Sequence, residues 1–334
     1  MKRATILTLC FILFTPMISS AENLTIATWN IENLGGSSRG FAPGYGAGNL
    51  PKRSDADIQE MADFIKNEIK VDVIAAQEIA ITDFDGDLAR NNKLDLLCNK
   101  LGGEWKYYLS TSRDGHIPEG HSNIFCAFIY DGDKVNLAKT VEMDLQNLYV
   151  GAKKAFDRRP LLGYFEVKKG AGTSNDFLLV NVHLASGQNN DENHLAAMVI
   201  IEQSLNLILK KNRIKESDRI VLGDANDNPH AKKPDGTPRY TDFLYQYMAH
   251  RKYRDLITEN SKATRMNRGL TSVIDHVLIN SSADKHIPSE KAIVFHPSNS
   301  APDELAKWRK TYSDHFPVLF KLKIESSDDD VDYH

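Results

Sequence analysis

The sequence predicts an α/β protein in which a mixed sheet, or a pair of sheets, is covered by helices on the outside. Early in the chain, apolar runs typical of strands alternate with segments of helical spacing, and hairpin-like strand pairs follow in the middle. No linker rich in Pro, Gly or Ser divides residues 22–325, so we expect these residues to form one domain.

The predicted elements follow one another along the chain. Leu24–Trp29 is an apolar run typical of a strand, and a glycine-rich segment from Gly35 to Gly48 comes after it. Ser54 and Asp57 form a capping-box pattern at the start of a helix. Further strands are expected over 71–76, 124–130, 161–167, 177–183, 220–222, 272–279 and 316–324. Further helices are expected around Leu94, Leu97 and Leu101, and from Asn190 or Asp191 to Ile208.

Residues 1–21 have the pattern of a secretory signal peptide. Lys2 and Arg3 precede an apolar stretch, Ile6 to Ile18, and small residues end the segment. The stretch is shorter than the roughly 20 residues that a membrane span needs. We therefore expect a protein secreted to the periplasm or the extracellular medium, without stable membrane insertion. Residues 326–334 form an acidic tail that we expect to be disordered.

The charge balance excludes a basic scaffold that coats nucleic acid. The chain has 41 basic and 45 acidic residues, and without Lys2 and Arg3 the balance is 39 against 45, a net charge of −6. Binding of a polyanion would have to be local or helped by a bound cation. Cys98 and Cys126 are the cysteines of the predicted mature chain, and a disulfide and two buried thiols are both compatible with export.

Five short motifs end or follow strand-like runs and concentrate polar chemistry at strand ends. They are Trp29-Asn30-Ile31-Glu32, Gln77-Glu78, Asn181-Val182-His183, Gly223-Asp224-Ala225-Asn226 and Ser313-Asp314-His315-Phe316-Pro317. Together they would line one sheet edge with carboxylates, amides and two histidines. A divalent ion held by carboxylates neutralises a phosphate, and Mg²⁺ prefers oxygen ligands. Glu78, an acid that ends a buried strand, is the leading candidate ligand, against the alternative of a solvated strand-end acid.

The other motifs supply groups that could move protons. Asp224 could orient or deprotonate water and Asn226 could contact phosphate, although the same residues are typical of a turn. His183 shares a strand face with Asn181, and a lone histidine in that place is more often structural. Asp275 lies inside an apolar strand, and a buried acid needs a partner, so we predict that it pairs with His315.

Arg158-Arg159-Pro160 precedes the strand that begins at Leu161. A guanidinium group binds phosphate with two donors, while an exposed basic pair is the alternative interpretation.

No single motif is specific, but the ordered set resembles the endonuclease/exonuclease/phosphatase superfamily, of the deoxyribonuclease I type, over residues 22–325. The resemblance implies a four-layer α/β sandwich of two packed mixed β-sheets flanked by helices. It implies Mg²⁺, with Mn²⁺ or Ca²⁺ as alternatives, near Asn30, Glu32, Glu78 and Asp314. It implies catalytic roles for His183, Asp224, Asn226, Asp275 and His315, and phosphate contacts from Arg158 or Arg159 and from Asn181. The partner of His183 stays open between Ser122-Asn123 and Glu119.

The leading functional prediction is a secreted, Mg²⁺-dependent, monomeric endonuclease that hydrolyses phosphodiester bonds of DNA. Water would attack with the help of the metal ion, and the histidines would act as acid and base. The alternatives are a sphingomyelinase, a phosphoinositide phosphatase or a subunit like that of cytolethal distending toxin, all with the same site. A catalytically inactive binding protein is the alternative from another class.

Overall fold

The structure is a computed structural model of the chain. It describes residues 23–36, 50–111, 124–145, 149–150, 153–154, 156, 158–169, 172–186, 191–227, 235–237, 253–258, 260–266, 272–298 and 301–324. The predicted signal peptide, most of the glycine-rich segment and the predicted acidic tail lie outside these ranges. The same holds for Glu119 and Ser122-Asn123.

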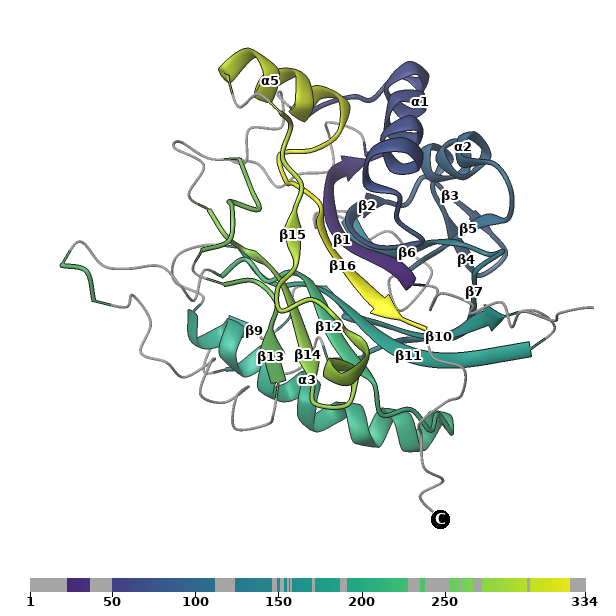
Figure 1. The fold of residues 1–334 in the computed structure, drawn as a ribbon, viewed down its shortest axis with the longest axis vertical. Helices are drawn as coiled ribbons and strands as arrows, with labels where there is room; N and C mark the ends of the chain where they lie inside the picture. The colour runs from purple at the N-terminus through teal and green to yellow at the C-terminus, as the bar shows by residue number, and fades with distance from the viewer. Residues whose placement is uncertain are drawn as a thin grey trace, which may run out of the picture.

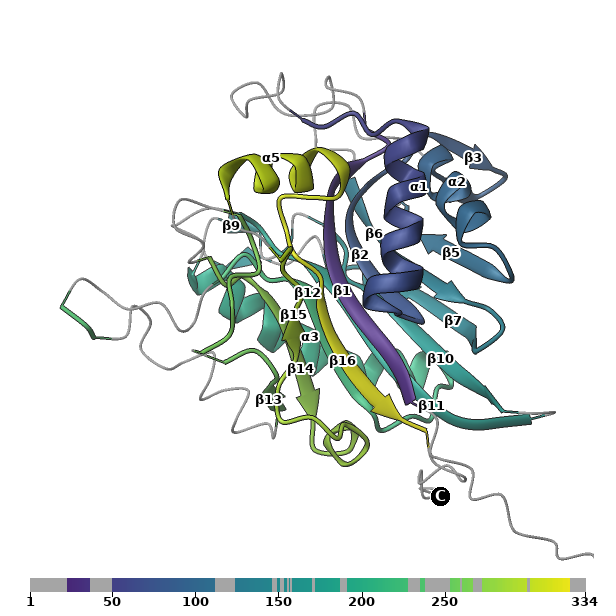
Figure 2. The same cartoon turned by 45° about the horizontal axis from the view of Figure 1, so that its top comes forward.

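Two six-stranded sheets pack face to face, and helices cover their outer faces (Figures 1 and 2). Helices α1 (Asp55–Phe64) and α2 (Asn92–Leu101) lie over the first sheet, and α3 (Asp191–Asn212) lies under the second. The predicted four-layer α/β sandwich is confirmed. In the part of the chain that the structure describes, no helix is long and apolar enough to cross a membrane.

The sheets are built as follows. The first has the order β15 (Ile293–Val294), β16 (Val318–Lys323), β1 (Asn23–Leu34), β2 (Val73–Ala80), β6 (Ile124–Asp131) and β5 (Trp105–Leu109). The second has the order β13 (Tyr253–Asp255), β14 (Asp275–Asn280), β12 (Arg219–Asp224), β11 (Gly172–His183), β10 (Leu161–Lys169) and β7 (Val135–Glu142). The pairs β3 (Asp83–Asp85) with β4 (Leu88–Arg90) and β8 (Tyr149–Val150) with β9 (Lys153–Lys154) form two-stranded sheets.

Two parallel strand pairs bring the predicted motifs to one edge. β1 is parallel to β2, and β11 is parallel to β12; α1 and α3 supply the crossovers that parallel pairs need. The carboxyl ends within each pair therefore coincide. The antiparallel neighbours begin at the same edge, because Asp275 of β14 lies opposite Asp224 and Val318 of β16 lies opposite Thr28.

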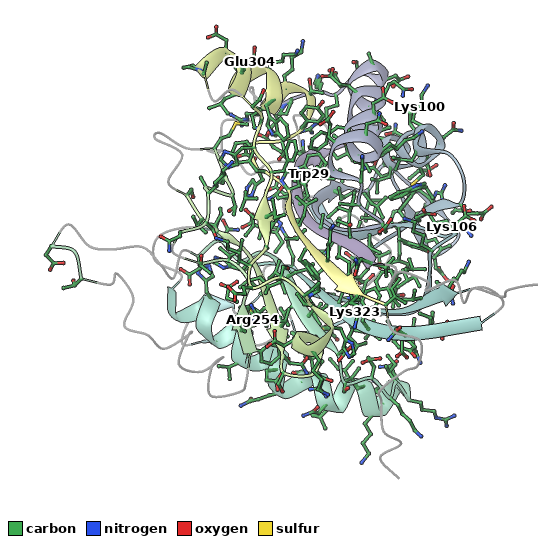
Figure 3. The ribbon with its side chains drawn as sticks, in the orientation of Figure 1. Trp29, Lys100, Lys106, Arg254, Glu304 and Lys323 are labelled. Atoms are coloured by element: carbon green, nitrogen blue, oxygen red, sulfur yellow. The ribbon has the colours of Figure 1, made fainter. Side chains whose placement is uncertain are left out.

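Aromatic side chains fill the space between the sheets. The Phe165 ring stacks on Phe177 with centroids 5.4 Å apart and meets Phe128 edge-on at 5.3 Å. A Cβ at Gly163 would come within 2.7 Å of Phe128, so only glycine fits there. Trp29, buried in the interior (Figure 3), packs edge-on against Phe64 of α1.

The structure confirms the predicted helix cap and contains several elements that the sequence analysis did not predict. The Ser54–Asp57 capping box is present, and α1 continues as a π-helical turn, η1 (Ile65–Ile69). Cys98 and Cys126 are both free thiols. The sequence analysis did not predict β3, β4, β5, β7, β8, β9, β13, β15, the π-helical turn η1, the 3₁₀ turn η2 (Ala283–His286) or helix α5 (Pro302–Thr311).

Asn181 joins the two sheets. Its side chain is fully buried, and its Nδ2 donates to the carbonyl oxygens of Ala76 and Ala127, both at 2.9 Å. Its Oδ1 accepts a hydrogen bond from Gln77 Nε2 at 2.7 Å. Both amide donors are thus used between β11, β2 and β6. The structure assigns Asn181 to the joint between the sheets, which corrects its predicted place at the substrate phosphate.

Replacing Asn181 with Leu should therefore lower stability and leave substrate affinity alone. The change removes the side-chain hydrogen bonds to the carbonyls of Ala76 and Ala127 and one of the hydrogen bonds of the Gln77 amide, at a cost of at least about 2 kcal/mol. Denaturant unfolding measures the loss, and Asn92→Leu on the exposed surface of α2 is the control, with an expected change of about 0.5 kcal/mol or less. Normal stability with a raised KM would instead return Asn181 to the substrate site.

Candidate active site

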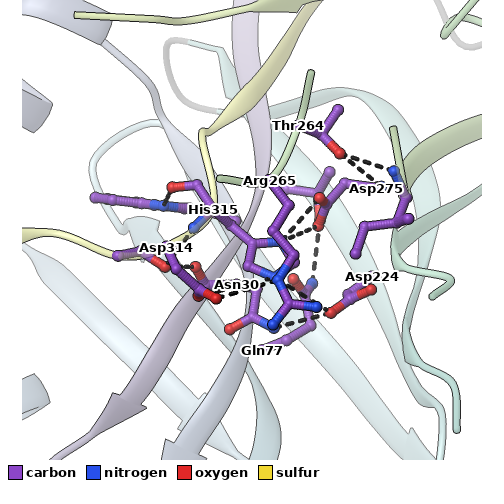
Figure 4. A network of polar contacts seen from close by, with 12 residues as sticks. Asn30, Gln77, Asp224, Thr264, Arg265, Asp275, Asp314 and His315 are labelled. Carbon is purple, nitrogen blue, oxygen red and sulfur yellow. Dashed lines mark hydrogen bonds and ion pairs between the residues drawn. The ribbon is translucent and has the colours of Figure 1, made fainter. Parts of the chain in front are cut away.

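The predicted motifs meet at the edge where the parallel pairs end. Figure 4 shows Asn30 of β1, Asp224 of β12, Asp275 of β14 and the pair Asp314 and His315 pointing toward one another. Asp314 and His315 belong to the segment that precedes β16. The site is thus built by both sheets of the sandwich.

The amide group of Asn30 links two carboxylates across the sheets. Its Nδ2 donates to Glu78 Oε1 at 3.0 Å and to Asp224 Oδ2 at 2.9 Å, and its Oδ1 accepts the Glu32 N–H at 3.0 Å. Burial raises the pKa of both acids, and the charge of Asp314 adds to the rise at Glu78. The acids are therefore packed more closely than their charges favour.

The predicted pairing of Asp275 with His315 is confirmed. His315 Nδ1 lies 2.8 Å from Asp275 Oδ2, and its Nε2 lies 3.7 Å from Asp224 Oδ2 and 3.9 Å from Asp314 Oδ1. Burial lowers the pKa of His315, but these three carboxylates outweigh it and raise the pKa to about 10. The ring is therefore an imidazolium that presents an Nε2 donor to the acids. Thr264 Oγ1 accepts the Asp275 N–H at 3.0 Å and helps to fix the pair.

His183 lies on the other side of Asp224 and has the opposite charge preference. Its Nε2 is 3.6 Å from Asp224 Oδ2 and 3.7 Å from Glu78 Oε1. Burial lowers its pKa well below 6.5, and the positive charge of Arg158 lowers it further. The two histidines thus differ in protonation state around one carboxylate, an arrangement typical of acid–base sites. Within the described residues, His183 Nδ1 has no hydrogen-bond partner.

Three strand-end residues of the site adopt left-handed backbone conformations. Glu32, Glu78 and Asn226 have φ of 41°, 61° and 51°. Such φ values are uncommon for residues with a side chain and cost of order 1–3 kcal/mol each. Asn226 is held by its Nδ2, which donates to the Leu184 carbonyl at 2.9 Å. Strain of this kind gathers where side chains must be aimed for function.

The carboxylate of Glu32 is bound by α5 and by the backbone of Asp314. Arg309 Nε of α5 donates to both of its oxygens, at 2.9 and 3.1 Å, and Glu32 Oε2 also accepts the Asp314 N–H at 3.1 Å. Glu32 therefore positions Asp314 through the backbone.

Two further contacts hold the end of β1 against the segment before β16. Arg53, which is buried, donates to the carbonyls of Glu32, Thr311 and Tyr312 at 2.8, 3.2 and 2.5 Å. The Ser313 hydroxyl donates to the Asn30 carbonyl at 2.6 Å. The motif that carries His315 is thus fixed directly onto the motif that carries Asn30.

The structure distinguishes between the two predicted phosphate-binding arginines. Arg159 Nη1 donates to Glu142 Oε2 at 3.4 Å, and its Nη2 lies 3.8 Å from Asp144. Arg158 acts electrostatically on Glu78 and His183 instead. Arg158 is therefore the arginine whose charge reaches the acid cluster.

Sequence reasoning missed three arginines at the site: Arg53, Arg265 and Arg309. Arg265 Nε donates to Asp314 Oδ2 at 3.1 Å. Arg309 had a readable signal, because Pro302 followed by two acids is typical of a helix start and places Arg309 in the last turn. Neither Arg53 nor Arg265 stands in a pattern that indicates a role.

Two acids and a histidine of the site lie close enough together to hold a divalent metal ion. One ligand atom from each of Glu78, His183 and Asp224 lies within 4.8 Å of the other two. A cation among them would relieve the charge repulsion that helps to raise the pKa of Glu78. These donors, mostly carboxylate oxygens, fit a hard divalent ion.

Comparison with known proteins supports the fold. No protein-family model matches the chain, and no curated protein matches it in sequence. The chain is similar to a solved endonuclease/exonuclease/phosphatase family protein from Bacteroides thetaiotaomicron, at 17% identity and a TM-score of 0.58 over 92% of this chain and 96% of that one. It is also similar to the mannosyl-6-phosphatase Bt3783 of that organism (16%, TM-score 0.55, 90% and 99%). Its likeness to the human Nocturnin catalytic domain with bound sulfate is comparable (14%, TM-score 0.55, 91% and 95%). The predicted resemblance is thus confirmed at the level of the fold.

A second buried pair of a histidine and a carboxylate, His276 with Asp255, lies on the opposite face of β14 from Asp275. His276 Nδ1 is 2.7 Å from Asp255 Oδ2, and its Nε2 is 3.1 Å from the Asp227 carbonyl. Burial lowers the pKa of His276, but the charge of Asp255 and the contacts with Asp227 outweigh it and raise the pKa to about 9. The ring is therefore a buried cation at neutral pH.

His276→Gln should show a stability loss that depends on pH. The folded pKa lies above the ordinary value of 6.5, so the cation stabilises the fold fully below about pH 6.5, and this contribution is lost as pH rises through about 9. A shift of this size corresponds to at most about 3 kcal/mol. Urea unfolding of both proteins from pH 6 to 10 should show the difference shrinking. A difference that is constant with pH would contradict the charged pair.

Proposed function

We propose that this protein is a secreted, Mg²⁺-dependent phosphodiesterase that acts on DNA. The observation that carries the proposal is the pair of histidines with opposite charge preferences on either side of Asp224, next to a cluster of acids. Hydrolysis of a phosphodiester needs charge neutralisation, an activated water and a proton for the leaving oxygen. The ordered motifs and the signal-peptide pattern of residues 1–21 support the choice of an exported nuclease.

The chain's own groups divide these tasks. Asp224, whose pKa is raised by burial, accepts a proton from water or orients it, and neutral His183 lies close enough to share that role. The imidazolium of His315, held by Asp275, donates from Nε2 to a phosphate oxygen or to the leaving oxygen. Arg158 adds positive charge on the His183 side of the site.

Glu78 would hold Mg²⁺ at this cluster, with the amide of Asn30 beside it, and Asp314 would add negative charge; Glu32 would position Asp314 through its backbone N–H. When bound, the ion supplies neutralisation of the phosphate charge.

Hydrolysis of phosphomonoesters is the second candidate. It is favoured by the similarity to the mannosyl-6-phosphatase Bt3783, whose TM-score equals that of Nocturnin. The same acids and histidines serve either reaction, so the substrate depends on the surroundings of the site.

Turnover on a substrate panel should separate the candidates. Purified protein without residues 1–21 is tested with plasmid DNA, RNA, sphingomyelin, phosphoinositides and a hexose 6-phosphate. We expect nicking of DNA in Mg²⁺ and its arrest by EDTA, because the acid cluster requires a cation. Cleavage that survives EDTA would rule out the metal assignment. Turnover of hexose 6-phosphate with intact DNA would select the second candidate.

Asp275→Asn should lower kcat by at least roughly 10²-fold, since an amide does not hold the His315 imidazolium. Asp255→Asn is a matched control, because it breaks an equally buried carboxylate–histidine pair on the opposite face of the same strand. The control should lose stability and keep kcat within a few-fold. Equal activity of both variants would remove His315 and Asp275 from the mechanism.

A further inference from the structure

Arg265 lies between the two segments that carry the acid cluster. Its main chain pairs with Ser272 on one side and with His315 on the other. The next residue, Met266, donates its N–H to the Asp314 carbonyl at 2.7 Å, and Thr264 accepts the Phe316 N–H at 2.8 Å. The backbone of Arg265 is therefore fixed against the histidine motif, and its side chain starts from a defined position.

The guanidinium group of Arg265 is only partly used by the protein. Nε donates to Asp314 Oδ2 at 3.1 Å, and the side chain is 42% exposed. In the part of the chain that the structure describes, neither terminal nitrogen makes a hydrogen bond, so four N–H donors remain. A side chain of this exposure can be reached by a ligand.

The charge of Arg265 reaches the whole cluster. It acts on Asp314 most strongly, then on Asp224 and Glu78, and it adds to the fall in the pKa of His183 that burial begins. Figure 4 shows the side chain extending across the group formed by Asn30 and Asp224. Arg265 thus lies within electrostatic reach of Asp224, the carboxylate proposed to act on water.

The guanidinium groups of Arg53 and Arg309, the other two arginines that the sequence analysis missed, already bind groups of the protein itself. All three guanidinium nitrogens of Arg53 donate to backbone carbonyls, and Arg309 binds Glu32 with two of its nitrogens. Arg265 differs because its outer nitrogens stay available beside the cluster.

We propose that Arg265 is a substrate-binding residue whose two terminal nitrogens bind the non-bridging oxygens of the scissile phosphate. The proposal rests on the phosphoesterase function proposed above. A guanidinium fork matches two phosphate oxygens, and its Nε can stay on Asp314 while the terminal nitrogens turn to the phosphate. Arg158 would supply charge on the His183 side, so that two arginines flank the phosphate.

The test is the affinity of the intact protein for inorganic phosphate, measured by calorimetry in Mg²⁺. Arg265→Gln should weaken phosphate binding by about tenfold or more, because charge-assisted bonds are lost. Arg265→Lys keeps a charge near Asp314 but loses the fork, so it should fall between Gln and wild type. Mg²⁺ affinity in the absence of phosphate should not fall in Arg265→Gln, because the change removes a positive charge that competes for Asp314.

Arg254→Gln is the matched control. Arg254 has a similarly exposed side chain, paired with Asp284, and lies opposite Ile279, four residues along β14 from Asp275 (Figure 3). It should leave both affinities unchanged. If Arg265→Gln fails to fold, as judged by its thermal transition, the Lys variant carries the test.

Three outcomes would overturn the proposal. These are unchanged phosphate affinity in the Arg265 variants, no phosphate binding by the wild type, and a loss of Mg²⁺ affinity equal to the loss for phosphate. The last result would make Arg265 a positioning residue for Asp314. Because the titration needs no turnover, it is separate from the function: wild type that binds phosphate through Arg265 but hydrolyses nothing on the panel would refute the enzyme alone.

Discussion

The buried carboxylate of Asp224 lies beside the partly buried carboxylate of Glu78, and the surrounding contacts compensate for that placement. Buried negative charges are costly unless hydrogen bonds and opposite charges accompany them. Asn30 supplies one hydrogen bond to each acid, His315 places a positive charge 3.7 Å from Asp224, and Arg158 and His315 act on Glu78. Since Asn30 belongs to the first sheet and Asp224 to the second, the acid pair also requires the two sheets to meet in one register at this edge.

Successive hydrogen bonds hold the residues around this pair in place. Asn30 is held by Ser313, whose hydroxyl also accepts the His315 N–H at 3.0 Å, so one side chain fixes the amide donor and the imidazolium together. Arg53 and Glu32 secure the same segment one layer further out. The left-handed backbone at Glu78 lowers stability, and the packing around it must offset that cost so that the carboxylate keeps its direction.

Sequence reasoning located the strand ends because chemistry and hydrophobic pattern agree there, and it paired Asp275 with His315 because a buried acid must have a partner. Sequence reasoning failed where a contact joins residues far apart in the chain, and where the role of a side chain depends on how deep it lies between the sheets. Arg53 reaches carbonyls 258 and 259 residues away, and no local pattern encodes such contacts. Asn181 shares the face of His183 as predicted, but at about 3.3 Å per residue it lies about 7 Å further from the edge, between the sheets. The same face is thus an active site at one position and a core at the other.

The position of Asp314 links substrate binding to cation binding. Arg265 contacts one oxygen of this carboxylate, and the other lies 3.9 Å from His315 Nε2, toward the cluster. A cation that shared the charge of Asp314 would weaken its attraction for Arg265, because the two positive groups compete for one acid. The guanidinium would then turn more readily toward a phosphate. The acids that attract the ion and the arginine that we propose to bind the substrate therefore form one electrostatic unit.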